Sequence, residues 1–169
     1  LQAFLERFSE HEKAPGAHLD IARSYMHRGR YEEAVAALKS FLAKEHYQDT
    51  KEIADARNML GRCYQLQKKF PEALETWREY LAKHPAHEAW STVQREIVNT
   101  EYMMADEARQ EEKYDKAREL FGEFATKYPL DPRNPQILYW YGEMEYEQEN
   151  WQPAIDEWGA RWIEPGFIV

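Results

Sequence analysis

Two histidines, His84 and His87, form the pattern in this sequence that is most like a metal-binding motif, because imidazole nitrogens are common zinc ligands. A zinc site would need further cysteine, histidine or carboxylate ligands at a matching spacing, and none accompanies this pair. The remaining histidines are scattered along the chain: His11, His18, His27 and His46. We therefore expect a pair of surface histidines at a helix junction and no metal site.

Cys63 is the only cysteine, so no disulfide can form within the chain. It lies two residues after Gly61, where we expect a small buried thiol rather than an exposed nucleophile. The sequence has no glycine-rich phosphate loop and no Ser–His–Asp order. These observations predict that the protein is not an enzyme and needs no cofactor.

The composition restricts the classes of partner. The 169 residues include 22 lysines and arginines against 31 aspartates and glutamates, which gives a net charge of −9. Nucleic-acid binding depends on clustered basic residues, and an acidic chain is also repelled by anionic membrane surfaces. No apolar run approaches the ~18 residues that a membrane span needs. We expect a protein or peptide partner, no nucleic acid and no membrane insertion.

A repeated pattern of small and large residues organises most of the chain. Four alanines each have an aromatic residue three positions before them and a large apolar residue four positions after them. We number these four copies one to four along the chain. The alanines are Ala34, Ala73, Ala117 and Ala154; the aromatics are Tyr31, Phe70, Tyr114 and Trp151; the large residues are Leu38, Trp77, Phe121 and Trp158.

A second small residue precedes each of these alanines by twelve positions. Two small residues at this separation allow two antiparallel helices to cross closely, while the bulky residues one turn away fill the space around the contact. Short polar segments such as HRGR and LQKK join the two helices. The pattern therefore predicts four antiparallel helix pairs. The second small residues are Ala22, Gly61, Ala105 and Gly142.

The stretch MLGRCYQLQKKFPEALETWREYLAKHP, residues 59–85, resembles the tetratricopeptide repeat (TPR) nearly throughout. Its first helix carries the small Gly61, its second helix carries Ala73 and Trp77, and Pro85 closes the unit. The resemblance implies an all-α fold, a right-handed α-solenoid of stacked antiparallel helix pairs forming a single domain over 1–169. The expected parts are a partial helix at 1–12, repeats at about 14–46, 51–85, 87–129 and 133–162, and a tail at 163–169.

The spacing of the copies is irregular. The alanines are 39, 44 and 37 residues apart (73−34, 117−73 and 154−117), whereas the family repeat is about 34 residues long. The inserted residues fall between the copies, and the long insertion before copy three predicts one extended helix within residues 87–113. Uneven arrays of this kind are common among bacterial cell-envelope repeat proteins, which the segment 139–158 resembles.

The first helix of each pair in such a stack is expected to line a concave groove. The residues three before, one after and four after the first small residue of each pair should face this groove. Four residues at such positions are Leu19, Met26, Gln65 and Arg109. Tyrosines with polar neighbours suit peptide recognition. The expected partner-binding residues are Arg23, Asn58, Arg62, Tyr102, Asp106, Tyr139, Glu143 and Tyr146.

The expected groove is polarised, with arginines in the first two copies and carboxylates in the last two. Six acidic residues and no lysine or arginine lie between Arg133 and Arg161, and they favour a partner with a basic segment. The acidic residues are Glu143, Glu145, Glu147, Glu149, Asp156 and Glu157.

Two functions fit these features. The first is a non-enzymatic scaffold that binds a peptide or a helical segment of another protein in the groove. The second is a structural spacer or self-assembly module of a larger repeat protein, without a groove ligand. The second follows from ends that look cut, with Phe4 and Phe8 on one face of the first helix and RWIEPGFIV after the fourth pair, since uncapped repeat ends seek neighbours.

Overall fold

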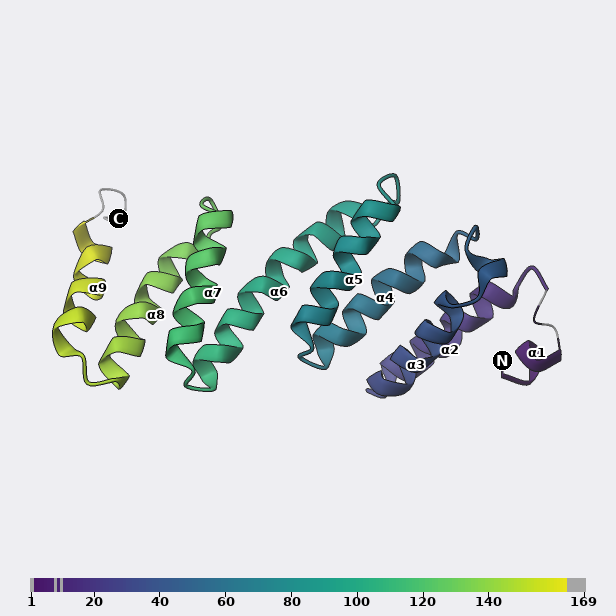
Figure 1. Cartoon of the computed structure of the whole chain (residues 1–169), viewed down its shortest axis with the longest axis horizontal. Coiled ribbons are helices and arrows are strands. Elements are labelled where there is room, and N and C mark those ends of the chain that lie inside the picture. The colour runs from purple at the N-terminus through teal and green to yellow at the C-terminus, as the bar shows by residue number, and fades with distance from the viewer. Residues whose placement is uncertain (1, 8, 10, 164–169) are drawn as a thin grey trace. The chain divides into compact units, whose positions relative to one another are not determined.

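The computed structural model describes residues 2–7, 9 and 11–163, all in helices or their connecting turns (Figure 1). The side chains of Phe4 and Phe8 and the tail after Ile163 lie outside the described residues. The elements are α1 (Gln2–Arg7), α2 (Ala14–His27), α3 (Tyr31–Leu42), the 3-10 helix η1 (Glu45–Tyr47), α4 (Glu52–Leu66), α5 (Phe70–Lys83), α6 (Trp90–Gln110), α7 (Tyr114–Lys127), α8 (Asn134–Glu147) and α9 (Trp151–Ile163).

The helices confirm the predicted all-α class and the four predicted pairs. We call the first helices of the pairs (α2, α4, α6 and α8) A helices and the second helices (α3, α5, α7 and α9) B helices. Two compact units, Leu1–Thr100 and Glu101–Val169, divide the chain within α6. The prediction that residues 1–169 form one continuous domain stays a prediction. The described part of the partial first helix ends at Arg7, earlier than the predicted residue 12.

The small residues lie in the core, as the pattern predicted. All four B-helix alanines are fully buried, and so are Ala22 and Ala105 on the A helices. The two remaining A-helix positions are the glycines Gly61 and Gly142, which are also buried. A Cβ on Gly61 would lie 2.6 Å from Cε2 of Trp77, so only glycine fits opposite this indole. Close helix contact therefore depends on these positions.

Each A helix is followed by a residue with left-handed backbone, seven positions after its small residue. Gly29 has φ 70°, whereas Lys68, Glu112 and Glu149 have φ of 59°, 59° and 61°. The next backbone N–H then donates to the carbonyl five residues earlier, which is the hydrogen bond of a Schellman motif. Three of these four turns thus hold a residue with a side chain in a conformation that glycine adopts more easily.

The predicted extended helix is confirmed by α6, which has 21 residues where α8 has 14. Its first turns add Val93 and Ile97 to the buried core of the first unit. The Trp90 indole N–H also donates to the Leu81 carbonyl at 3.4 Å. The residues inserted between copies two and three therefore bury further apolar surface. Among the described helices, none combines the length and the apolar composition needed to cross a bilayer.

Candidate functional site

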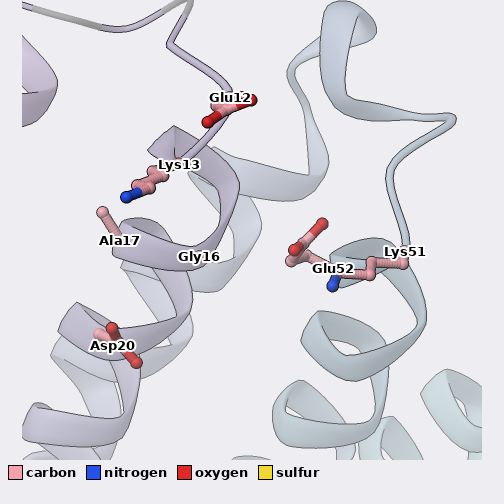
Figure 2. Close-up of a pocket in the computed structure, with 7 residues that line it drawn as sticks. All are labelled: Glu12, Lys13, Gly16, Ala17, Asp20, Lys51 and Glu52. Carbon is pink, nitrogen blue, oxygen red and sulfur yellow. The ribbon is translucent and has the colours of Figure 1, made fainter.

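A cleft opens between the beginnings of the A helices α2 and α4 in the first unit (Figure 2). Its volume is about 580 Å³. Gly16 contributes to the open space, since a Cβ built there would meet no atom within 4 Å. The lining residues are Glu12, Lys13, Gly16, Ala17, Asp20, Lys51 and Glu52.

The cleft carries charges of both signs. Figure 2 shows Glu12 and Glu52 on opposite sides of the space between the two helices. Lys13 and Lys51 are the N-cap residues of α2 and α4, where the helix dipole is already positive. Among the described residues, no hydrogen bond or ion pair joins the lining side chains of α2 to those of α4. Apart from Asp20, which pairs with Arg23 of the same helix, these groups are therefore available to a bound segment.

The repeat pattern does not predict this cleft. It predicts groove residues of copy one at Leu19, Arg23 and Met26, nearer the middle of α2. Leu19 is only 3% exposed, so the expectation that it faces the groove is wrong. The adjacent small residues Gly16 and Ala17, one and a half turns before Ala22, were the available signal. Arg23 is exposed and donates to Asp20, a lining residue, at 2.8 Å.

The next joint of the first unit, between α4 and α6, is closed by side chains. Arg62 donates to Gln65 Oε1 at 2.7 Å and to Glu96 Oε2 at 3.1 Å. The buried Gln65 amide in turn donates to Thr100 Oγ1 at 2.7 Å. Arg62 is half-exposed, so it ties two A helices together while part of it remains accessible.

Asn58, another expected groove residue, is half-buried against the B helix of its own pair. Its Oδ1 accepts a hydrogen bond from the Trp77 indole N–H at 3.1 Å, and its backbone carbonyl accepts from the same N–H at 3.3 Å. Asn58 therefore positions the ring that fills the space opposite Gly61. Neither a hydrogen bond nor an ion pair in the described part joins Arg23, Asn58 and Arg62 to one another.

In the second unit, Arg109 brings two expected groove residues together. Its guanidinium lies 2.9 Å from an Asp106 carboxylate oxygen and 3.1 Å from Glu143 Oε2. The same guanidinium stacks on the Trp140 ring, 3.1 Å from its centroid. Arg109 and Gln65 occupy the same position, four residues after the small residue of their A helix. In both units this position links neighbouring A helices.

The three tyrosines of the expected site differ in exposure. Tyr102 is half-buried, with its ring 5.6 Å from that of Phe121 and 5.5 Å from that of Phe124. Burial raises the pKa of Tyr102, which keeps its hydroxyl protonated. Tyr139 and Tyr146 are exposed on α8. These two present more surface to a partner than Tyr102 does.

The acidic run in the second unit is partly neutralised. Arg118 pairs with Glu145 and, at 3.7 Å, with Glu157. Glu143 is held by Arg109. Both arginines precede the run in sequence, on α6 and α7, so the lack of basic residues within the run did not reveal these pairs.

The side chains that could act in catalysis or metal binding are engaged in packing and hydrogen bonds within the protein. The Tyr80 hydroxyl and His87 Nδ1 are hydrogen-bonded at 2.7 Å, and burial lowers the pKa of His84. Cys63 is fully buried, which raises the pKa of its thiol to about 11. A thiol with this pKa is a poor nucleophile at neutral pH. The described residues include no group of three or more metal-ligating side chains.

Comparison with known proteins identifies the family. The family model for the tetratricopeptide repeat matches residues 1–50, 19–88 and 102–166. The chain belongs to the tetratricopeptide repeat family. TPR proteins are in general non-catalytic scaffolds for protein interaction, and this TPR chain has the helix pairs of that class. No curated protein matches its sequence at a significant level.

Solved structures similar to this TPR chain have low sequence identity. The crystal structure of MamA is 16% identical, covers 95% of this chain and 84% of its own, and has a TM-score of 0.47. The nearly identical TPR-like repeats of a Podosopora anserina protein described as a kinesin light chain are 16% identical. They cover 90% of this chain and 75% of their own, with a TM-score of 0.41. Similarities this weak carry no argument about function.

Proposed function

We propose that this protein is a scaffold that binds an extended or helical segment of a partner protein against its A helices. The cleft between α2 and α4 is the observation that carries this proposal. The joint between α4 and α6 is closed by Arg62, Gln65 and Glu96, whereas the charged groups that line the cleft make no bond across it within the described residues. A segment entering there can pair with both lysines and carboxylates.

The residues proposed for partner contact fall into two groups. Arg23, Arg62, Tyr139 and Tyr146 have exposed surface on A helices, so they can contact a partner directly. Asn58, Tyr102, Asp106 and Glu143 are half-buried and are held by contacts within the protein. We expect these four residues to contact the partner and also to hold neighbouring side chains of the protein in place. Lys13 and Lys51 extend the first group into the cleft.

A photo-cross-linking side chain at position 16 tests the proposal, because the space around Gly16 accepts it without a clash. The matched control carries the same group at Ala36, an exposed position on the B helix α3 of the same pair. In an extract of the cells that make the protein, we expect discrete protein adducts from position 16 and none from position 36. Equal labelling at both positions would contradict binding in the cleft.

A structural spacer or self-assembly module is the second candidate, and one observation favours it. Ile155, one residue after Ala154 on α9, is 58% exposed, whereas the equivalent Leu74 on α5 is 4% exposed. An apolar residue at this position in copy two is thus covered, and in copy four it is open to a neighbour. Sedimentation velocity at several concentrations tests this alternative. Concentration-dependent association that Ile155→Lys abolishes would support a spacer, and a monomer at every concentration would contradict it.

A further inference from the structure

A second pocket lies in the second unit, at the turn between α7 and α8. Its volume is about 470 Å³, in the lower part of the range of about 300–1,000 Å³ typical of small-ligand sites. It contains none of the expected groove residues. The lining residues are Ala125, Pro129, Leu130, Asp131, Pro132, Asn134, Pro135, Ile137, Leu138 and Tyr141.

The Asp131 carboxylate and the Asn134 amide N–H at this pocket are engaged within the protein. The Asp131 carboxylate accepts hydrogen bonds from the Arg133 guanidinium at 2.7 and 2.8 Å. The Asn134 amide donates to the Tyr128 carbonyl at 2.8 Å. The Asn134 Oδ1 is buried without a hydrogen-bond partner among the described residues. The rest of the lining offers mainly hydrocarbon surface, and an apolar side chain is the group that it suits.

The shape of the pocket is set by the backbone around it. Three prolines, Pro129, Pro132 and Pro135, restrict φ through the turn and the first residues of α8. Leu130 stands at the turn with 96% of its surface exposed. Little ordering is needed before a side chain enters, and a preformed site loses less conformational entropy on binding.

One of the lining residues, Ala125, is smaller than its equivalents in the first two copies. Ala125 lies eight residues after Ala117, and the equivalent positions in copies one and two are Leu42 and Leu81. Copy three therefore has a methyl group where the other two copies have an isobutyl group. Because the same fold holds leucine at this position twice, replacing Ala125 by leucine should fill the pocket without preventing folding.

The charge of the second unit indicates the partner. Residues 1–100 contain fifteen lysines and arginines and fifteen aspartates and glutamates, which gives a net charge of zero. Residues 101–169 contain seven lysines and arginines and sixteen aspartates and glutamates, so the whole net charge of −9 belongs to the second unit. At the Tyr141 end of the pocket, Arg118 lies 5.1 Å over the ring and is shared by Glu145 and Glu157. One guanidinium between two carboxylates leaves a local negative charge.

We infer that this pocket binds one bulky apolar side chain of a partner segment whose flanking residues are lysine or arginine. The apolar side chain supplies the buried contact, and the flanking cations are attracted by the acidic surface of the unit. The pocket is formed by the end of α7, the turn after it and the first turns of α8, and it shares no lining residue with the cleft between α2 and α4. The inference therefore does not depend on that cleft.

Fluorescein-labelled synthetic peptides test the inference by fluorescence anisotropy. The probe is acetyl-Lys-Lys-Trp-Lys-Lys-amide, and the comparisons replace its tryptophan by alanine or its lysines by glutamates. We expect each replacement to weaken binding at least tenfold. The Ala125→Leu variant should weaken binding of the probe at least tenfold, while Thr126→Leu, which adds volume at an exposed neighbouring position outside the lining, leaves it unchanged.

Three outcomes would overturn the inference. The first is equal binding of the alanine peptide, which would mean that charge alone attracts the probe. The second is equal binding of the glutamate peptide, which would remove the basic requirement. The third is concentration-dependent dimerisation that Leu130→Ser abolishes, since the occupant would then be a second copy of this chain. If Ala125→Leu destabilises the protein, Leu130→Ser replaces it as the test variant. Leu130 is exposed, so this substitution should keep the fold and weaken binding of the probe at least threefold.

Discussion

The indole ring of Trp77 occupies the space that a side chain on Gly61 would need. The same relationship recurs in copy four, where a Cβ on Gly142 would lie 2.9 Å from Cε2 of Trp158. In the other two copies, the A-helix residue is alanine and the B-helix residue is smaller than tryptophan. The sizes of the two crossing residues are thus matched: Ala22 with Leu38, Gly61 with Trp77, Ala105 with Phe121 and Gly142 with Trp158.

Gly61→Ala should reduce the free energy of unfolding by about 1–3 kcal/mol, because the added methyl group overpacks the crossing. Urea denaturation followed by circular dichroism measures the change. Adding Trp77→Phe to the same chain should recover part of the loss, since copy three pairs alanine with phenylalanine. Unchanged stability of Gly61→Ala would contradict the matched sizes.

Glu112→Gly should increase the free energy of unfolding by about 1 kcal/mol, because Glu112 has φ 59° and a side chain in left-handed backbone is strained. The reverse change, Gly29→Lys, should lower it by a similar amount at the equivalent turn of copy one. Thermal melts of the two variants provide the measurement. A stabilised Gly29→Lys would show that the turn geometry is misassigned.

Arg109→Met should reduce the free energy of unfolding by about 2 kcal/mol, because it leaves two partly buried carboxylates without their shared cation. The control is Lys113→Met, which removes an exposed pair with Glu111 and should leave the free energy of unfolding nearly unchanged. Equal losses measured by urea denaturation would mean that Arg109 does not link α6 to α8.

His18 should make the first unit less stable as the pH falls. Burial, with Lys44 and His46 nearby, lowers the pKa of His18 from 6.5 to about 4 in the folded state. Between these values the unfolded chain takes up a proton that the folded chain does not, so the free energy of unfolding falls from pH 6.5 towards pH 4. His18→Gln should reduce this dependence in urea titrations at several pH values. An identical pH profile would rule out His18 as its source.

The fold could be predicted because its determinants are local and repeated. Ala73, Gly61 and Trp77 lie within seventeen residues, and their helical spacing by itself brings them to one crossing. The site was harder to predict, because its contacts join residues far apart in sequence. Arg62 meets Glu96 across two A helices, and no pattern within one copy reveals which residues of the next copy it will face.

Other features were missed because the residue types gave the opposite signal. Lysine and glutamate are uncommon in left-handed backbone, so the sequence predicts only polar connections at Lys68 and Glu112. Ala125 fits a helix face anywhere, and the pocket beside it becomes visible only when Leu42 and Leu81 are compared at the equivalent position. Comparison between copies therefore indicates a pocket that the residue type alone does not.

Cross-linking from position 16 in the presence and absence of the cleft lysines tests the proposed scaffold function most directly. The protein with the photo-cross-linker at residue 16 is compared with the same protein carrying Lys13→Glu and Lys51→Glu. We predict discrete partner adducts in the first and at least a tenfold loss in the second, with unchanged circular dichroism. Adducts of equal yield in both proteins, or none in the first, would contradict binding of a partner segment in the cleft between α2 and α4.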